Sequence, residues 1–312
     1  MQDLEQLKVS VVVPFHNADS YLAQALESIA ASSHRNIEVI LINDGSTDGG
    51  GVTAKMVAAR DSRFTYLANE SNRRVSFCRN VGLREATGDF ILFVDSDDRI
   101  SADWIQNLLR TAVAEGADVV IGKAKRCRAD SVADYDMKGL TRRGALAFGD
   151  IVFKDNAVLW NKLYSASIVR RWRIHFDEDL WIGEDLVFNY LVLGRAKRIY
   201  YSGEGFYYYR ADSPSSIMRS STPATRIRNL SRVLSLLVEC SLTIETKNPG
   251  VLKKVAKDIL VNAYRHNEAI DPSTMAVIRR VAPLMPGSVR LKVLLKSLRN
   301  AIVPQNSPDR GR

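Results

Sequence analysis

The sequence predicts an α/β protein with a Rossmann-like, three-layer and mostly parallel sheet, followed by a helical C-terminal extension. Short apolar runs rich in β-branched residues alternate with segments of helical periodicity through the first 122 residues. Several of these runs are apolar at successive positions, which is typical of strands buried on both faces. Together these observations place helices on both sides of one sheet.

Composition limits the class of protein. The chain has 312 residues, of which 46% are hydrophobic and 25% charged, so it can form one large soluble domain with an appendage. Its three cysteines, Cys78, Cys127 and Cys240, have no paired spacing, which argues against a disulfide framework or a zinc site. The first residues show no basic and apolar leader pattern. We therefore expect a cytoplasmic protein.

The first half of the chain is expected to alternate strictly between strands and helices. A run that ends in a proline or in a polar turn is read as a strand, and the next apolar stripe at helical spacing as a helix. A helix after the first strand is expected to be capped by Asp19 or Ser20. The expected strands are Val9–Pro14, Glu38–Ile42, Phe64–Leu67, 90–94 and Asp118–Ile121, and the later helices are Val52–Ala59, Phe77–Ala86 and Asp103–Glu115.

Polar loops follow three of these strands. They are Pro14–Asn17, Asn43–Ser46 and Asp95–Asp98. Ligands of open α/β sheets bind beyond the carboxyl ends of the strands, so these loops should converge on one site. The sequence has no G-x-G-x-x-G and no G-x-x-x-x-G-K-[ST], which excludes a dinucleotide fingerprint and a P-loop.

The loop after the fourth main strand carries three acids, Asp95, Asp97 and Asp98. Clustered carboxylates repel one another unless a cation lies among them, and Mg²⁺ or Mn²⁺ prefers oxygen ligands shared with phosphates. The alternative is an acidic turn in which Asp98 or Ser101 caps the next helix. By itself the loop favours neither interpretation.

The second half of the chain is less regular. Residues 123–155 read as loops and short elements, and a second acid-rich stretch, 176–188, carries Glu184 and Asp185 at the start of a helix. Acids in a first turn often only complement the helix dipole, which is the simpler interpretation of Glu184. Asp185 is a candidate general base. Further expected elements are strands at Ile199–Tyr201 and Phe206–Arg210, and helices at Ser167–Trp172 and Leu186–Leu193, while the apolar stretch Val158–Tyr164 is left unassigned.

Positive charge is concentrated at the C-terminus. Residues 219–312 hold 17 Lys and Arg against 6 Asp and Glu, whereas the remaining residues hold 27 against 29. Helices are expected at Thr225–Leu242 and Val251–His266, with a basic amphipathic helix at 289–303 and a disordered tail at 304–312. The amphipathic helix either lies on an anionic membrane surface or packs on the domain. No nucleic-acid motif accompanies the charge.

Six short motifs occur in order between Val9 and Ser216. They are VSVVVPFHN, INDGSTDG, CRNVGL, ATGDFILFVDSDD, WNKLY and GEDLVF. In this order and spacing they resemble the family 2 glycosyltransferases, which have the GT-A fold and use nucleotide-sugar donors. The resemblance implies a catalytic domain at 1–218, with a nucleotide-binding half at about 1–122 and an acceptor half at about 123–218. A basic helical region at 219–303 and the tail at 304–312 would follow it.

The resemblance implies roles at the nucleotide end of the site. Pro14 and Phe15 would lie against the base, and Asp44 would accept a hydrogen bond from the uracil ring N–H. This implies a UDP-sugar, although Asn43 stands where many members of the family have an aspartate. Arg79 would contact the diphosphate.

The resemblance also implies a metal site and a catalytic base. Asp97 would bind Mn²⁺ or Mg²⁺ directly, and Asp95 would contact the ribose or the metal through water. Asp185 matches the family's base, with Glu184 beside it as a candidate for substrate binding. Arg210 resembles a residue of a loop that closes over the donor. Trp181 is either a stacking surface for the sugar or a core aromatic residue.

The expected function is inverting, metal-dependent transfer of a sugar to a cell-surface polysaccharide or lipid-linked glycan, with a peripheral position on the inner face of the membrane as a further hypothesis. A nucleotidyltransferase is one alternative, but it predicts a Gly-rich basic loop after the first strand, which is absent. A non-catalytic glycan- or membrane-binding protein is another, and Asp44, Asp97 and Asp185 argue against it. The sequence does not predict the sugar, the acceptor or the oligomeric state.

Overall fold

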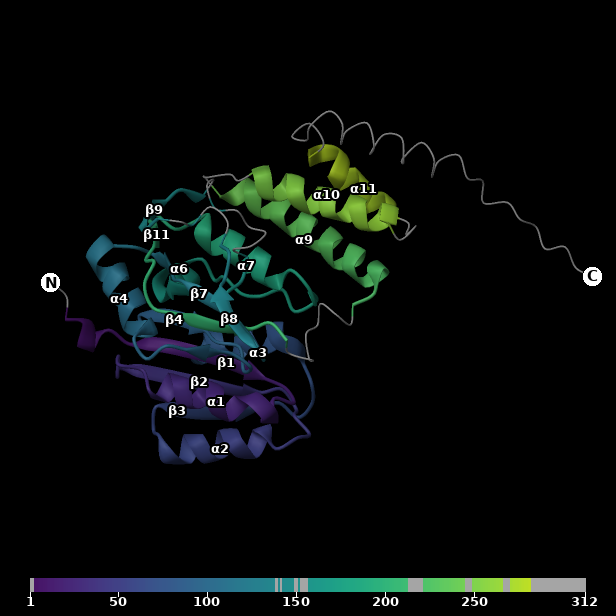
Figure 1. Cartoon of the computed structure of the whole chain (residues 1–312). Coiled ribbons are helices and arrows are strands. Elements are labelled where there is room, and N and C mark those ends of the chain that lie inside the picture. The colour runs from purple at the N-terminus through teal and green to yellow at the C-terminus, as the bar shows by residue number, and fades with distance from the viewer. Residues whose placement is uncertain are drawn as a thin grey trace, which may run out of the picture.

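A computed structural model describes residues 3–137, 140, 142–148, 151, 157–212, 221–244, 249–265 and 270–281. It confirms the predicted α/β class, with one large sheet between two layers of helices (Figure 1). The strand order of the large sheet is β3-β2-β1-β4-β10-β6-β11-β9. In chain order these strands are β1 (Val9–Phe15), β2 (Ile37–Asn43), β3 (Phe64–Ala68), β4 (Phe90–Phe93), β6 (Val119–Ile121), β9 (Gly144–Leu146), β10 (Lys162–Ser165) and β11 (Ile199–Tyr201).

The sheet is mostly parallel, as predicted. Strands β1, β2, β3 and β4 run in the same direction, and β6 and β11 are parallel to each other. Strand β10 is the exception at the centre, because it lies antiparallel between β4 and β6. The carboxyl ends of β1, β2 and β4 therefore meet at one edge of the sheet.

Side chains of the central strands alternate between two cores. On β1, Val11 and Val13 enter one core and Val12 enters the other, and all three are fully buried. The first core is covered by α1 (Asp19–Ala30), α2 (Gly50–Arg60) and α4 (Trp104–Glu115). The second is covered by α3 (Arg74–Glu85), α6 (Ala166–Arg171) and α7 (Glu184–Leu193). A short 3₁₀ helix, Leu4–Gln6, precedes β1.

The predicted cap of α1 is wrong. Its N-cap is Ala18, which makes no side-chain cap, and Asp19 is already helical. The N–H of Asp19 is instead satisfied by the Asp48 carboxylate, 29 residues away, at 2.9 Å. A contact across this distance in sequence leaves no local signal.

A second sheet of four strands covers the loop after β4. It contains β5 (Arg99–Ile100), β12 (Tyr207–Arg210), β7 (Ala124–Arg128) and β8 (Ser131–Asp134), in that order. Only loops and short elements are predicted for the β7 and β8 region, because β8 is exposed throughout and has no apolar face. Strand β12 contacts the loop after β4 and so joins this sheet to the carboxyl edge of the large one.

In the described part of the C-terminal region the chain forms α9 (Pro223–Thr243), α10 (Pro249–Arg265) and α11 (Pro272–Val281). In α9, Val233, Leu234 and Leu237 are fully buried in the same core as Phe188 of α7. Figure 1 shows α9 and α10 side by side on the α7 side of the molecule, away from α1 and α2. The predicted boundary at 218/219 stays a prediction, but α9 shares the core of the sheet.

Two predicted segments, the amphipathic helix at 289–303 and the tail at 304–312, lie outside the described residues. In the part of the chain that is described, no helix combines the length and the apolar character needed to cross a bilayer.

Candidate active site

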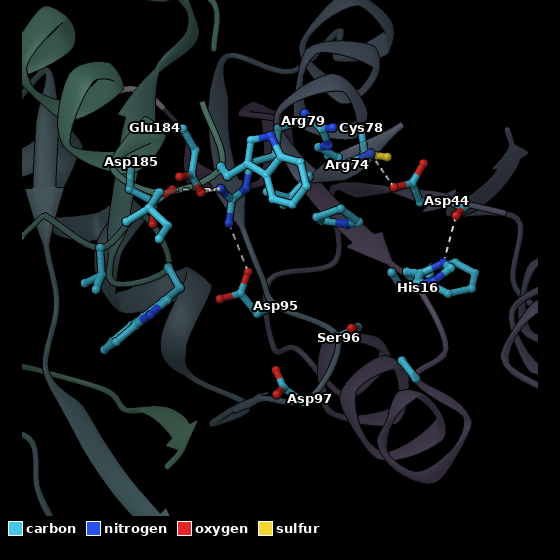
Figure 2. A pocket seen from close by; sticks show the side chains of 18 of the residues that line it. His16, Asp44, Arg74, Cys78, Arg79, Asp95, Ser96, Asp97, Glu184 and Asp185 are labelled. Atoms are coloured by element: carbon cyan, nitrogen blue, oxygen red, sulfur yellow. Dashed lines mark hydrogen bonds and ion pairs between the residues drawn. The ribbon is translucent and has the colours of Figure 1, made fainter. Parts of the chain in front are cut away.

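One cavity of about 1050 Å³ opens at the carboxyl edge of the large sheet (Figure 2). All of the residues proposed from the sequence line it. They are Pro14, Phe15, Asp44, Arg79, Asp95, Asp97, Trp181, Glu184, Asp185 and Arg210. The prediction that separate polar loops converge on one site is thus confirmed, while the role of each residue stays a prediction.

Asp44 is held rigidly at one end of the cavity. It is 4% exposed, and its carboxylate accepts hydrogen bonds from Asn69 Nδ2 at 2.8 Å and from the Arg74 N–H at 2.7 Å. The next residue, Gly45, has φ +68°, and a Cβ there would lie 2.7 Å from the backbone of Ser71. Only glycine allows this close approach, which fixes the position of the Asp44 carboxylate.

The loop after β4 is anchored by its third acid. Asp98 is buried, and its carboxylate accepts hydrogen bonds from the Tyr207 hydroxyl at 2.8 Å and from the Arg210 N–H at 2.7 Å. Burial raises its pKa well above the ordinary value. The prediction that Asp98 or Ser101 caps the following helix is wrong, because the N-cap of α4 is Asp103, without a side-chain bond.

Arg210 belongs to the same anchor. Its Nε donates to the carbonyl oxygen of Asp97 at 3.0 Å, and its guanidinium lies 4.5 Å from the centre of the Tyr21 ring. These contacts hold the backbone of the acidic loop. The serines after Arg210, which resemble part of a closing loop, lie outside the described residues.

The first two acids of the loop, Asp95 and Asp97, suit a divalent cation. Asp95 and Asp97 both line the cavity, and no described N–H or O–H group donates to the Asp97 carboxylate. No group of three or more His, Cys, Asp or Glu among the described residues is arranged to hold a metal alone. One or two carboxylates completed by phosphate oxygens are, however, the usual ligands of Mg²⁺. The residues present therefore suit a metal that binds together with a diphosphate.

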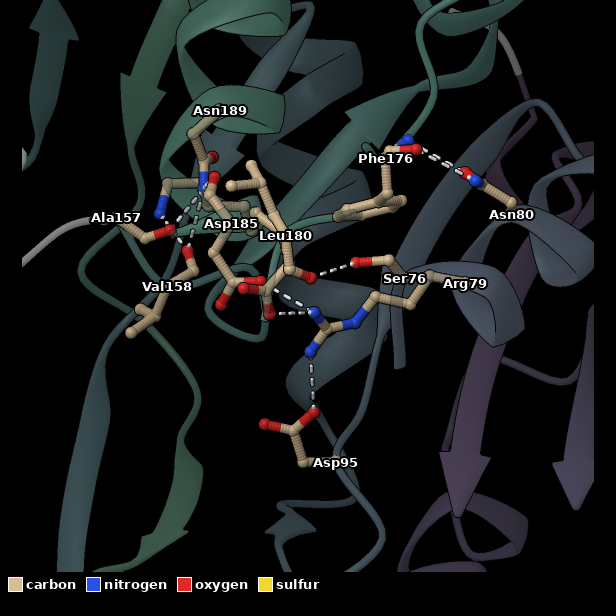
Figure 3. Close-up of polar contacts among 12 residues, drawn as sticks. Ser76, Arg79, Asn80, Asp95, Ala157, Val158, Phe176, Leu180, Asp185 and Asn189 are labelled. Atoms are coloured by element: carbon tan, nitrogen blue, oxygen red, sulfur yellow. Dashed lines mark hydrogen bonds and ion pairs between the residues drawn. The ribbon is translucent and has the colours of Figure 1, made fainter. Parts of the chain in front are cut away.

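Arg79 joins the acidic loop to the start of α7 (Figure 3). Its Nη1 contacts Asp185 Oδ1 at 2.7 Å and Glu184 Oε1 at 3.0 Å, and its Nη2 contacts Asp95 Oδ1 at 3.3 Å. The Arg79 side chain is only 6% exposed. Its predicted contact with the diphosphate stays a prediction, since the contacts seen here are to carboxylates.

Three carboxylates share this one guanidinium, so their charges are not balanced. Burial, followed by the charge of Asp185, raises the pKa of Glu184 to about 8 despite Arg79. Burial likewise raises the pKa of Asp95 to about 6. Glu184 has the least exposed carboxylate of the three, at 11%. Burial and the neighbouring Asp185 charge thus act together on Glu184, so its surroundings differ from those of an exposed dipole partner.

The loop before α7 is clamped by one face of α3 (Figure 3). Asn80 exchanges two hydrogen bonds with the backbone of Phe176, at 2.8 and 3.0 Å, and the Ser76 hydroxyl donates to the Leu180 carbonyl at 3.4 Å. Arg79 and Asn80 lie three and four positions after Ser76, so all three are on the same side of the helix. One helix face thus holds both the loop and the acids that follow it.

The opposite side of the same loop is held by α9. Asn229 Oδ1 accepts from the Trp181 N–H at 2.8 Å and from the Ile182 N–H at 3.4 Å. One turn further on, Arg232 forms an ion pair with Asp177 at 2.8 Å. Sequence reasoning missed both residues. The available signal was a buried asparagine in an amphipathic helix, which needs a polar partner.

Aromatic and basic residues on the acceptor side are mostly structural. Trp160 is 4% exposed and stacks on Tyr207 with ring centres 4.5 Å apart, and Tyr164 is fully buried and bonds to Asn189. Lys162 is also fully buried, and burial lowers its pKa to about 7. Trp160 and Trp181 both line the cavity, but Trp181 differs from the others in being 47% exposed.

The Asp185 backbone is fixed by a further buried side chain. Asn189 Nδ2 donates to the carbonyl oxygens of Asp185 at 2.9 Å and of Ala157 at 2.5 Å (Figure 3). The Asp185 side chain remains 27% exposed toward the cavity. It is therefore both oriented and accessible.

Comparison with known structures supports the fold. The crystal structure of Staphylococcus aureus TarS 1–349 in complex with UDP superposes with a TM-score of 0.76 over 94% of this chain and 88% of that chain, at 20% identity. The mannosyltransferase PcManGT from Pyrobaculum calidifontis, in complex with GDP-Man and Mn²⁺, gives a TM-score of 0.53 over 94% of this chain and 87% of that chain, at 14% identity.

Comparison of sequences identifies the family. Glycosyltransferase GlyA of Streptococcus pneumoniae is 28% identical over 269 residues, which are 82% of this chain and 38% of GlyA. The poly(ribitol-phosphate) β-N-acetylglucosaminyltransferase TarS is 26% identical over 69% of this chain and 37% of TarS. The chain thus spans well under two thirds of these relatives. Residues 10–171, more than half of the 312, match the model of glycosyl transferase family 2. The chain belongs to glycosyltransferase family 2.

Proposed function

We propose that this protein transfers a sugar from a nucleotide-sugar donor, a UDP-sugar, to a hydroxyl group of a cell-surface polysaccharide or lipid-linked glycan, with metal dependence and inversion at the anomeric carbon. One observation carries the proposal: a metal-suited acid pair, Asp95 and Asp97, and an oriented acid, Asp185, line the same cavity. Family membership favours this activity over nucleotidyl transfer.

The donor end of the cavity is the end that contains Asp44, Pro14 and Phe15. The TarS structures that resemble this chain are complexes with UDP and UDP-GlcNAc, which supports uridine as the base and UDP-GlcNAc as the first donor to test. Asp44 is the acceptor that we assign to the uracil N–H. Its carboxylate is already oriented by Asn69 and Arg74, so it loses little freedom when the base binds.

Asp97 and Asp95 are the residues that would hold Mn²⁺ or Mg²⁺. When bound, such an ion acts as a Lewis acid that neutralises charge on the departing diphosphate. Asp97 is the better direct ligand, because its carboxylate accepts no hydrogen bond from the described residues, whereas that of Asp95 is shared with Arg79. The hydrogen bonds to Asp98 hold both acids at the carboxyl end of β4.

Asp185 is the group that we assign as general base. Its position is set by Arg79 on the side chain and by Asn189 on the backbone, and part of its carboxylate faces the cavity. An acceptor hydroxyl is a weak nucleophile near neutral pH, so Asp185 removes its proton as the oxygen attacks. Attack from the face opposite to the diphosphate inverts the anomeric carbon.

The test is hydrolysis of a panel of UDP-sugars with Mn²⁺, Mg²⁺ or EDTA, beginning with UDP-GlcNAc. We expect metal-dependent release of UDP, reduced about 100-fold or more in Asp97→Ala through loss of a metal ligand. Asp134→Ala is the matched control, since that carboxylate is 84% exposed on β8 and lies outside the cavity. Full metal-dependent hydrolysis by Asp97→Ala would overturn the metal assignment. No binding or hydrolysis of any nucleotide-sugar would favour the non-catalytic alternative.

The membrane hypothesis has a separate test. It rests on the basic charge of the C-terminal third, whose segment 289–303 is not described by the structure. Removal of residues 286–312 should weaken binding to vesicles that contain phosphatidylglycerol. Unchanged binding would refute a membrane role for this segment without affecting the catalytic proposal.

A further inference from the structure

Arg74, the first residue of α3, lies on the wall of the cavity between its two ends (Figure 2). Its backbone N–H contacts Asp44 at the nucleotide end. Its guanidinium lies 3.8 Å from the centre of the Trp181 ring. Arg74 is exposed, and Trp181 is 47% exposed. The pair thus forms a cationic surface stacked on an aromatic ring and open to the ligand.

Arg74 differs from the two other arginines that line the cavity. The guanidinium of Arg79 is taken up by three carboxylates, and that of Arg210 donates to Asp97 O and Gln24. For the Arg74 guanidinium, no carboxylate or hydrogen-bond acceptor is found among the residues that the structure describes. Its fork of N–H donors is therefore available to an anion.

The many acids of the cavity favour a phosphate-binding role for the Arg74 guanidinium. Five acids line it: Asp44, Asp95, Asp97, Glu184 and Asp185. Any phosphate that enters meets this negative field, and Arg79 is already shared among three of the acids. Bidentate contact between a guanidinium and phosphate oxygens is a strong, charge-assisted interaction.

The backbone of Arg74 is also strained. Its φ is +74°, in the left-handed region that is unfavourable for a residue with a side chain. Glycine or asparagine would be more favourable at this φ if only the turn mattered. Strained residues are concentrated at ligand-binding sites, where the surrounding structure holds them in place. Here Asp44 and Asn72 both accept from the strained N–H, at 2.7 and 3.0 Å.

We propose that Arg74, supported by Trp181, is a phosphate-binding residue of this cavity. The inference rests on the proposed function, because the phosphate has two sources in such a reaction: the diphosphate of the donor, or a phosphate group carried by the acceptor. The shared chemistry is a phosphate oxyanion held by a guanidinium that is stacked on an indole ring. The experiment separates the two sources.

The test compares Arg74→Asn with Arg73→Asn. Asparagine tolerates the positive φ at position 74, so the first variant removes the guanidinium without new backbone strain. The second removes the same charge from the adjacent residue, whose guanidinium stacks on Phe77 at 4.1 Å and does not line the cavity. Binding of UDP, uridine and inorganic pyrophosphate is measured by calorimetry with Mn²⁺. The KM for an acceptor mimic that bears glycerol phosphate is measured alongside.

If the donor is the source, Arg74→Asn should weaken binding of UDP and pyrophosphate about 10- to 100-fold, the loss expected for one charged hydrogen-bonded contact. The affinity of Arg74→Asn for uridine should stay at the wild-type value. The affinity of Arg73→Asn for all three ligands should stay at the wild-type values too. If the acceptor is the source, UDP binding should be unchanged and the KM for the phosphate-bearing mimic should rise instead. Equal effects of the two variants, or no effect on either ligand, would overturn the proposal.

Two further variants test the stacking. Arg74→Lys keeps the charge but loses the planar fork, and Trp181→Ala removes the indole surface; each should weaken phosphate binding by a smaller factor, about 3- to 10-fold. A wild-type protein that binds pyrophosphate but not UDP would contradict the proposed donor and leave the phosphate site standing. If the wild-type protein binds UDP, and Arg74→Asn alters neither this binding nor the KM for the acceptor mimic, the phosphate-binding role of Arg74 is contradicted and the proposed donor stands.

Discussion

The two ends of the cavity are built in different ways. At the nucleotide end, Asp44 and the Asp95–Asp98 loop follow directly from parallel strands whose ends meet by topology. At the acceptor end, Asp185 follows an irregular loop that is held between α3 and α9 by side-chain hydrogen bonds and ion pairs. Strand ends bring Asp44 and the acidic loop together, and contacts such as Tyr207 to Asp98 then hold that loop, whereas Asp185, the proposed base, depends on such distant contacts alone. The second end should therefore be the more sensitive to substitutions outside the cavity.

The largest effect is expected from removing the base itself. Asp185→Asn keeps the shape and the Asn189 contact but cannot accept the proton, so kcat for transfer should fall about 10²- to 10⁴-fold. The Kd for UDP with Mn²⁺ should be unchanged, because the nucleotide end is built separately. Transfer at the wild-type rate would remove Asp185 from the mechanism.

Alanine substitutions at Gly183 and Gly203 measure how tightly α9 packs on the loop before α7. Gly183 has φ +90°, and a Cβ there would lie 2.7 Å from Val233 of α9; Gly203 has φ +67° with no atom nearer than 3.9 Å. Gly203→Ala should lower the free energy of unfolding by about 1 kcal/mol through backbone strain alone. Gly183→Ala should lower it by about 2–4 kcal/mol, since overpacking adds to the strain. Urea denaturation checks both, and equal losses would show that α9 yields at this contact.

Asn229→Ala tests whether α9 positions the base. Two backbone N–H groups next to the helix that carries Asp185 lose their acceptor, so we expect kcat to fall about 10-fold with little change in the KM for the donor. Asn36→Ala is the control, because that side chain also bonds to backbone, at Glu5 and Gln6, far from the cavity. A rise in donor KM with unchanged kcat would contradict the division into two ends.

The smallest expected effect concerns pH. The pKa of Glu184 is raised from 4.5 to about 8, so the folded protein binds a proton that the unfolded chain releases. Its contribution to stability is present at low pH and is lost as pH rises through 8, by about 1 kcal/mol between pH 7 and 9. Glu184→Gln cannot lose this proton, so its stability relative to the wild type should rise by about that amount between pH 7 and 9, whereas the surface variant Glu204→Gln should keep a constant difference from the wild type. Urea denaturation at pH 7, 8 and 9 measures the difference.

The nucleotide end was largely predictable from sequence. The apolar run of β1 predicts a strand buried on both faces, and the rule that ligands bind at the carboxyl ends of strands brings Asp44 and Asp97 together. Both residues line the cavity, as this reasoning predicts. Family motifs contributed Asp185, which no local pattern distinguishes from an ordinary first-turn acid.

The supporting contacts were not predictable, because they join positions far apart in the chain. Asp98 and Tyr207 are separated by 109 residues, Arg79 and Asp185 by 106, and Trp181 and Asn229 by 48. Local periodicity and capping rules do not reach such distances, which is why a helix cap stays open for Asp98 when only the sequence is considered. Burial is what turns these side chains into anchors, and burial is known only once the layers are assembled.

The position of α9 has a consequence for building hybrid enzymes. The match to the family model ends at residue 171, but the loop that leads into Asp185, the proposed base, is held in place by Asn229 and Arg232, more than forty positions later. A chimaera joined near residue 218 would combine a loop from one parent with a clamp from another. Residues 172–244 should therefore be exchanged as one module, and hybrids joined on either side of that module should retain activity more often than hybrids joined within it.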